Sequence, residues 1–207
     1  MRVDRQGDLT PARFVGDALQ NPVNRAILQR LPALGLPDAW LVAGCLFQTI
    51  WNVQAGRPPA SGIKDYDLFY FDAADLSEQA EAAVGERVAA ALVDLGVTIE
   101  AKNQARVHTW YPQWFGQPYP ALTSAQDGID RFLVPCTCVG LQAVPGLPAR
   151  PVLYAPNGID DLYAGILRPN PLCDHRSLFR DKALSYQARW PWLQIVEETK
   201  GLSAPAG

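Results

Sequence analysis

The chain has 207 residues, 48% of them hydrophobic, and a formal net charge of −3, which is typical of one globular domain, and we expect residues 1–207 to form a single domain. No run approaches eighteen consecutive apolar residues, and the N-terminus lacks the apolar core of a signal peptide, so we expect no membrane span and a cytoplasmic location. The acidic balance, without a stripe of lysine and arginine, argues against binding of long DNA.

The chain begins with two short predicted helices. Thr10 precedes a proline and so does Asn21, a pattern typical of a capping residue followed by proline at the first helical position. Residues 1–8 at the start and 197–207 at the end carry no pattern of a packed element. We expect both terminal segments to be flexible.

Residues 40–54 predict a strand, a tight turn and a helix. Residues 40–43 are a short apolar run, Gly44 interrupts it, and residues 45–54 have the apolar spacing of a helix. The N-terminus of a helix can bind phosphate through its free N–H groups, and glycine allows a close approach. We therefore predict that Gly44 and Cys45 present backbone N–H groups to an anionic ligand.

The next predicted strand, residues 64–71, carries two carboxylates at alternate positions. Asp65 and Asp67 should point to the same side, with Cα atoms roughly 6.5 to 7 Å apart. Such carboxylates repel one another, and a divalent cation relieves the repulsion. Oxygen ligands of this kind suit Mg²⁺, with Mn²⁺ as a substitute, and water and substrate phosphates complete the shell. A solvated strand edge is the alternative interpretation of the same pattern.

The chain then continues with a predicted helix and a further strand. Asp75, followed three residues later by Glu78, predicts a helix start, and Gly96 marks its end. Residues 97–102 alternate between apolar and polar types, which predicts a strand with Glu100 and Lys102 on one face.

The last third of the chain predicts short elements. Ser124 and Asp127 indicate a capped helix, and residues 136–142 and 151–154 indicate paired strands. Ser177 opens a last amphipathic helix. The four cysteines are too sparse for a disulfide framework, and we expect free thiols.

These segments resemble the head of the DNA polymerase beta-like nucleotidyltransferase superfamily, most closely the CCA-adding enzyme and poly(A) polymerase type. In that type a glycine pair precedes a helix, and a D-x-D strand follows. The blocks IKDYD (63–67), KNQARVH (102–108) and LRPNP (167–171) also resemble a bacterial nucleotidyltransferase-like family. The likeness covers about residues 38–190. It implies an α+β fold, with a small mixed sheet and flanking helices.

The resemblance implies an enzyme that moves a nucleoside monophosphate from a nucleoside triphosphate to a hydroxyl or phosphate acceptor and releases pyrophosphate. It also implies a third metal-binding carboxylate on a strand after the D-x-D strand, where Glu100 is the acidic residue. The alternative for Glu100 is an exposed ion pair with Lys102. We expect Lys64, Lys102 and Arg106 to contribute to nucleotide binding, Arg106 through a bidentate contact to phosphate.

The sequence departs from the CCA-adding pattern near the turn. Cys45 stands where glycine or serine is usual, and Phe47 and Gln48 replace a common Arg-Asp pair, so the preferred base stays open. The acceptor also stays open among a small molecule, an RNA and a protein. The alternative function is a non-catalytic nucleotide-binding or regulatory protein on the same fold. The retained pair Asp65 and Asp67 favours the enzyme.

Overall fold

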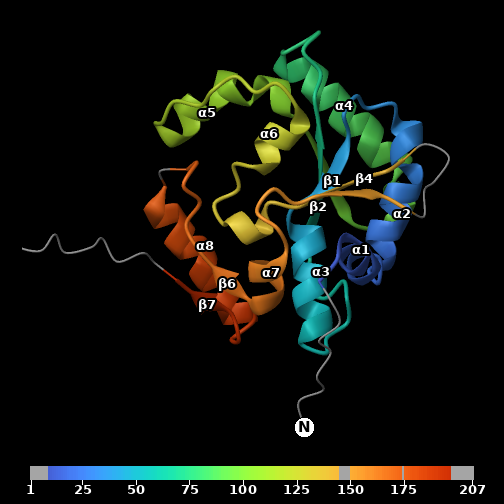
Figure 1. The fold of residues 1–207 in the computed structure, drawn as a ribbon. Helices are drawn as coiled ribbons and strands as arrows, with labels where there is room; N and C mark the ends of the chain where they lie inside the picture. Colours follow the sequence, from blue (N-terminus) through green and yellow to red (C-terminus); the bar gives the residue numbers. More distant parts are fainter. Residues whose placement is uncertain (1–8, 145–149, 174, 197–207) are drawn as a thin grey trace, which may run out of the picture.

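The computed structural model describes residues 9–144, 150–173 and 175–196 (Figure 1). Among these residues, five strands form a mixed sheet in the order β3-β2-β1-β4-β5. The pair β2 and β3 is parallel, and the other neighbours are antiparallel. The strands are Trp40–Val42 (β1), Asp65–Tyr70 (β2), Thr98–Asn103 (β3), Gly140–Gln142 (β4) and Val152–Tyr154 (β5). The predicted α+β class with a small mixed sheet is confirmed.

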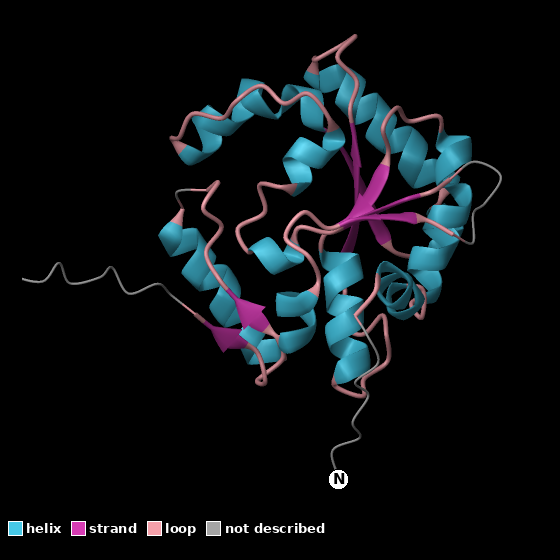
Figure 2. Ribbon diagram, viewed as in Figure 1, coloured by secondary structure: helices cyan, strands magenta, loops and turns pink. Residues whose placement is uncertain are grey.

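Helices flank this sheet, and two short strands pair in parallel beside it (Figure 2). The α-helices are Pro11–Ala18 (α1), Pro22–Arg30 (α2), Gly44–Gln54 (α3), Glu78–Ala91 (α4), Val107–Phe115 (α5), Ala125–Ile129 (α6), Asp160–Ala164 (α7) and Arg176–Arg189 (α8). The 3₁₀ turns are Leu31–Leu34, Val93–Leu95, Gln104–Arg106 and Pro135–Thr137. The short strands are Ile166–Leu167 (β6) and Gln194–Ile195 (β7).

The predicted caps of the first two helices are confirmed. Thr10 accepts a hydrogen bond from the Arg13 amide (3.2 Å), and Asn21 accepts one from the Val23 amide (3.0 Å). The Asn21 side chain is buried and also donates to the hydroxyl groups of Thr49 (3.1 Å) and Tyr66 (3.2 Å). This one side chain therefore ties α2 to both α3 and β2.

The predicted start of the helix that follows β2, which is α4, is wrong by two residues. The carboxylate of Asp75 accepts from the Ser77 amide (2.8 Å), which holds Ser77 in an extended conformation. Ser77 is then the cap of α4, and its hydroxyl accepts from the Ala80 amide (3.2 Å). Local hydrogen bonding by Asp75 competes with helix formation, and the helix cap lies two residues later than predicted.

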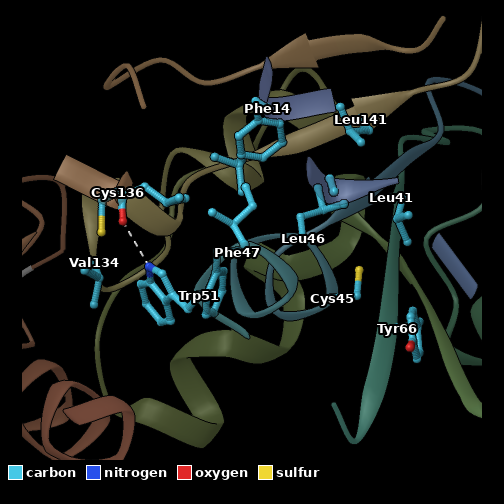
Figure 3. Close-up of a cluster of buried hydrophobic side chains, with 14 of the residues drawn as sticks. Phe14, Leu41, Cys45, Leu46, Phe47, Trp51, Tyr66, Val134, Cys136 and Leu141 are labelled. Carbon is cyan, nitrogen blue, oxygen red and sulfur yellow. Dashed lines mark hydrogen bonds between the residues drawn. The ribbon is translucent and has the colours of Figure 1, made fainter. Parts of the chain in front are cut away.

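Strand β2 separates an apolar face of the sheet from a polar one. Its residues Tyr66, Leu68 and Tyr70 are buried, whereas the alternate residues are partly exposed. The buried face packs into the main core, drawn in part in Figure 3, whose members from other elements include Phe14 and Leu46. The opposite face also carries Trp40 and Val42 of β1, which pack against Ala125 and Ile129 of α6.

Within the described ranges, no helix combines the length and the apolar character needed to cross a bilayer. The terminal segments that we expect to be flexible, residues 1–8 and 197–207, lie outside the described residues.

Candidate functional site

A pocket of about 390 Å³ lies over the polar face of β2, where this strand meets the start of α3. Asp65 and Asp67 form one wall, and Ala43 and Gly44 form the next. We call this hollow the carboxylate pocket. Its other lining residues are Phe47, Gln48, Tyr111, Phe115, Arg131, Phe132, Leu133, Val134, Thr137, Leu178, Lys182 and Tyr186.

The two aspartates face the same side of β2, as their spacing predicts. The pKa of the Asp67 carboxyl is raised to about 6, first by burial and then by the negative charges of Asp65 and Glu100, against the opposing charges of Lys102 and Lys182. A carboxylate held among like charges is stabilised by a cation. The oxygen-only donor pair therefore fits Mg²⁺ or Mn²⁺.

The aspartate pair would need further ligands to hold a metal ion. Across the described part of the chain, no three side chains of His, Cys, Asp or Glu are grouped closely enough to form a ready-made metal site. Magnesium commonly takes only one or two protein carboxylates and completes its shell with water and phosphate oxygens. Asp65 and Asp67 could therefore hold such an ion only together with water or phosphate oxygens.

The turn before α3 holds an uncommon backbone conformation. Ala43 has φ 59° and ψ −127°, a region that favours glycine, and it precedes the first helical residue without a side-chain cap. Its carbonyl accepts from the Leu46 amide (3.0 Å). The amides of Gly44 and Cys45 are the first two of the helix, where N–H groups have no acceptor within the helix. Gly44 lines the carboxylate pocket, whereas Cys45 is not among its lining residues. That the two amides bind an anion stays a prediction.

Gln48 covers this turn with its side-chain amide. A Cβ atom on Gly44 would lie 2.7 Å from Nε2 of Gln48, so a side chain at position 44 would require the end of the Gln48 side chain to shift. Arg189 of α8 donates to Oε1 of Gln48 (2.6 Å) and to the Gly62 carbonyl (3.0 Å). Because Oε1 accepts from Arg189, Nε2 faces Gly44 and offers a donor beside the helix N-terminus.

Two cations of the pocket were missed by sequence reasoning. Lys182 of α8 lies with Nζ 5.6 Å from the ring centre of Tyr186, and its charge opposes the rise in the pKa of Asp67. Arg131 lies over the ring of Tyr119 (5.2 Å). The signal available for Lys182 is its spacing with Leu178 and Tyr186, four residues on either side, since all three line the pocket from one helical face.

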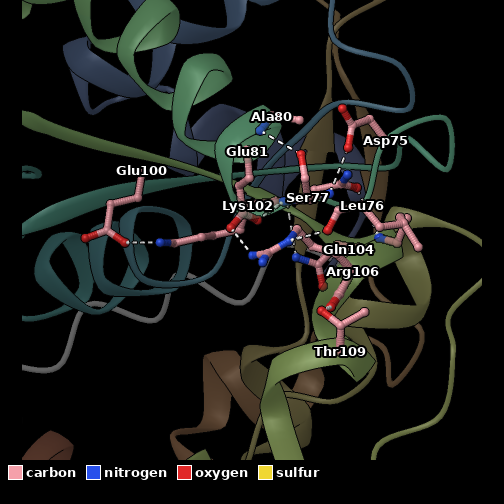
Figure 4. Close-up of polar contacts among 12 residues, drawn as sticks. Asp75, Leu76, Ser77, Ala80, Glu81, Glu100, Lys102, Gln104, Arg106 and Thr109 are labelled. Carbon is pink, nitrogen blue, oxygen red and sulfur yellow. Dashed lines mark hydrogen bonds and ion pairs between the residues drawn. The ribbon is translucent and has the colours of Figure 1, made fainter.

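Glu100 lies on the same face of the sheet as the aspartates but outside the lining of the carboxylate pocket. It is directly opposite Asp67 in the parallel pair of β2 and β3. Its carboxylate is 3.5 Å from Nζ of Lys102, and both side chains are about half exposed (Figure 4). The ion pair expected under the alternative interpretation is therefore present. The role of Glu100 as a third metal ligand stays a prediction.

The remaining predicted nucleotide-binding residues lie away from this pocket. Arg106 is buried, and its guanidinium contacts the Glu81 carboxylate (2.6 Å) and donates to the Leu76 carbonyl (3.1 Å; Figure 4). Lys64 is exposed just before β2, and Lys102 pairs with Glu100. Their roles in nucleotide binding stay predictions.

The side chain of Cys45 points away from the carboxylate pocket, and a role for its backbone amide stays a prediction. Its side chain is fully buried against the sheet, its Sγ contacts the Val42 carbonyl (3.3 Å), and burial raises the pKa of the thiol. The cysteines are free thiols, as expected: Cys45, Cys136, Cys138 and Cys173.

Comparisons with known proteins identify the family and the fold. A family model described as Nucleotidyltransferase matches residues 29–195, which include the turn at Gly44 and both aspartates. A solved structure reported as "The NMR structure of the protein reveals a CCA-adding enzyme head domain" is 25% identical, with a TM-score of 0.73. The match covers 92% of this chain and 97% of that one. No curated protein sequence matches the chain.

Proposed function

The chain belongs to this nucleotidyltransferase family, and from that premise we propose that it is a divalent-metal-dependent enzyme. It moves a nucleoside monophosphate from a nucleoside triphosphate to a hydroxyl or phosphate acceptor and releases pyrophosphate. The acceptor is a small molecule, an RNA or a protein. The overall charge of −3 supports an acceptor other than long DNA.

The observation that carries the proposal is the position of Asp65 and Asp67 beside the Gly44 turn in one pocket. One wall supplies carboxylate oxygens, which would hold a divalent cation, and the next supplies amide N–H groups, so a phosphate chain between them would meet the cation on one side and hydrogen-bond donors on the other. No lysine-bearing phosphate loop or glycine-rich kinase loop occurs in the sequence. This favours attack at the α-phosphate, the reaction of the family, over transfer of the γ-phosphate.

The proposal gives a role to each of the predicted metal and phosphate ligands. Asp65 and Asp67, with Glu100 as the third ligand, hold Mg²⁺ or Mn²⁺, which supplies charge neutralisation and lowers the pKa of the attacking hydroxyl when bound. The amides of Gly44 and Cys45 bind the triphosphate.

Two side chains near the turn add further contacts to the phosphates. The Nε2 of Gln48 donates a further hydrogen bond to the triphosphate, and Lys182 adds positive charge. Catalysis then rests on in-line positioning and on electrostatic stabilisation of the charge that develops at the α-phosphate.

The test uses a nucleoside triphosphate labelled at either the α or the γ phosphorus. Purified protein, Mg²⁺ and a pool of small hydroxyl compounds, tRNA and the protein itself are incubated with each label. Label should enter product only from the α position, together with stoichiometric pyrophosphate. Asp65→Asn should abolish transfer, and Glu86→Gln, which removes an exposed carboxylate on α4, should not. Transfer of γ label would refute the proposal.

One observation favours a second candidate, the non-catalytic nucleotide-binding or regulatory protein. Glu100 is held in an ion pair with Lys102 and stands outside the pocket lining, so the described carboxylates offer two close ligands instead of three. Nucleotide that raises the melting temperature without any transfer of label would favour this candidate.

A further inference from the structure

A second hollow, of about 520 Å³, adjoins the carboxylate pocket. The two share four lining residues, which are Tyr111, Phe115, Arg131 and Phe132. The second hollow adds four more aromatic residues, which are Phe69, Trp110, Trp114 and Tyr119. We call it the aromatic pocket. The aromatic pocket lies directly beside the proposed phosphate site, so the two together fit a ligand that has both a phosphate chain and a flat ring.

The rings of the aromatic pocket are already packed into a wall. The ring of Tyr111 lies 4.5 Å from that of Phe115 and 4.4 Å from that of Tyr119, measured between centroids. On the other side, Phe69 of β2 contacts Phe132 (5.6 Å). A wall that is ordered before binding loses little conformational entropy when a ligand stacks on it.

Two rings of α5 remain open to solvent. Trp114 is 79% exposed and Phe115 is 46% exposed, although both are large apolar side chains that folding would normally cover. Trp110 and Trp114 are four residues apart on α5, so they lie on one face of this helix and both line the aromatic pocket. The exposed rings are therefore available to a ligand in that pocket.

Strand β2 connects the two pockets in a straight line. Asp65, Asp67 and Phe69 alternate on one face, and the first two line the carboxylate pocket while Phe69 lines the aromatic pocket. From Asp65 to Phe69 the strand advances roughly 13 Å. Val42 is opposite Asp67 in the antiparallel pair, so the Gly44 turn after β1 lies toward the Asp65 end. The order along the face is phosphate turn, carboxylates, aromatic rings.

From this order we propose that the aromatic pocket binds the nucleobase of the nucleoside triphosphate. The inference rests on the proposed function, because it takes the triphosphate to lie between Gly44 and the aspartates. A nucleotide carries its base at the opposite end from its terminal phosphate, which matches the order along β2. The base stacks on the rings of α5, with Trp114 as the outer ring.

The polar groups of the aromatic pocket predict weak discrimination among bases. Most of the polar side chains that line this pocket already have partners. Arg106 is held by Glu81 (2.6 Å), Lys102 pairs with Glu100, the Gln104 amide donates to the Lys102 carbonyl (3.3 Å), and Arg131 lies over the ring of Tyr119 (5.2 Å), which leaves Glu78 as the exposed carboxylate of the lining. Polar side chains that already have partners are less able to form hydrogen bonds that distinguish one base from another, whereas stacking on aromatic rings stabilises every base. We therefore expect all four bases to bind, with affinities that differ by less than about tenfold.

The test compares ligands with and without a base. Non-hydrolysable α,β-methylene analogues of ATP and CTP, and inorganic tripolyphosphate, are titrated in Mg²⁺ by calorimetry. The analogues should bind wild-type protein at least about tenfold more tightly than tripolyphosphate, given the usual strength of stacking on aromatic side chains. Trp114→Ala should remove most of this difference and leave the affinity for tripolyphosphate unchanged. Trp114→Phe should restore it.

Controls separate the failure of this inference from that of the proposed function. Val93→Ala, which alters a 74% exposed side chain outside both pockets, should change neither affinity. Equal binding of tripolyphosphate and the analogues would overturn the inference and leave the phosphate site intact. A preference for the analogues that survives Trp110→Ala and Trp114→Ala together would also overturn it. If neither class of ligand binds, the proposed function fails as well.

Discussion

Replacing Asp67 by asparagine should stabilise the metal-free protein at neutral pH. Burial and the charges of Asp65 and Glu100 raise the pKa of the Asp67 carboxyl from 3.8 to about 6. Because the folded state binds this proton more tightly than the unfolded state, stability is lost as the pH rises from about 4 to about 6 and does not return above that range. Asparagine carries no charge and escapes this loss.

The size of the effect follows from the same two pKa values. The difference between 3.8 and about 6 corresponds to about 3 kcal/mol, since each tenfold change in proton affinity is worth about 1.4 kcal/mol. Water that reaches the partly exposed carboxylate screens its charge, which lowers the expected gain. We expect Asp67→Asn to raise the free energy of unfolding by about 1 to 2 kcal/mol at pH 7.5. The gain should vanish near pH 4.

The assay is urea unfolding followed by tryptophan fluorescence, with EDTA, at pH 4 and pH 7.5. Glu86→Gln serves as the control for removal of an exposed carboxylate on α4. Added Mg²⁺ should stabilise wild type at pH 7.5 and should stabilise Asp67→Asn less, because the variant has lost a proposed ligand. A variant that is less stable than wild type at pH 7.5, or a gain of equal size at both pH values, would refute the electrostatic reasoning.

Three other substitutions test single features of the site and its support. Glu100→Gln should reduce the transfer rate by orders of magnitude if Glu100 is the third metal ligand, whereas loss of the exposed pair with Lys102 alone costs at most about 1 kcal/mol in urea unfolding. Ala43→Gly should stabilise the protein by about 1 kcal/mol in the same assay, because glycine adopts φ 59° without strain. A loss of stability would show that packing of the Ala43 Cβ atom contributes more than relief of the backbone strain. Arg106→Gln should destabilise by about 3 kcal/mol, because it leaves the largely buried Glu81 carboxylate without its cationic partner, and the added change Glu81→Gln should recover part of that loss.

The carboxylate half of the site could be predicted from the sequence because its signals are local. Alternation along β2 fixes the common direction of Asp65 and Asp67, and the break at Gly44 fixes the start of α3. Both patterns extend over a few residues, and backbone geometry alone carries them. Alternation along β3 predicted only that Glu100 and Lys102 share a face. That this face also carries the aspartates follows from the parallel pairing of β3 with β2, in which Glu100 is opposite Asp67.

The cationic half could not be predicted, because it depends on long-range packing. Arg106 has the spacing and charge of a phosphate ligand, yet its guanidinium is held by Glu81 of α4. Lys182 lies far from Asp67 in the sequence and reaches the pocket because α8 packs beside α3. A local sequence pattern does not distinguish a basic side chain that pairs with a carboxylate, as Arg106 does, from one that lines an open pocket, as Lys182 does.

The docking of α8 on α3 therefore links the fold to the proposed phosphate site. Tyr186 packs its ring against Phe47 (5.3 Å) and Trp51 (5.4 Å), and the Trp190 indole donates to the Asn52 side chain (3.1 Å). These contacts fix the helix that carries both Lys182 and the arginine that orients Gln48. Since a triphosphate at the Gly44 turn would contact groups from both helices, its binding energy would also hold the two helices together. Stability and phosphate binding are for this reason expected to rise and fall together in variants of the interface between α3 and α8.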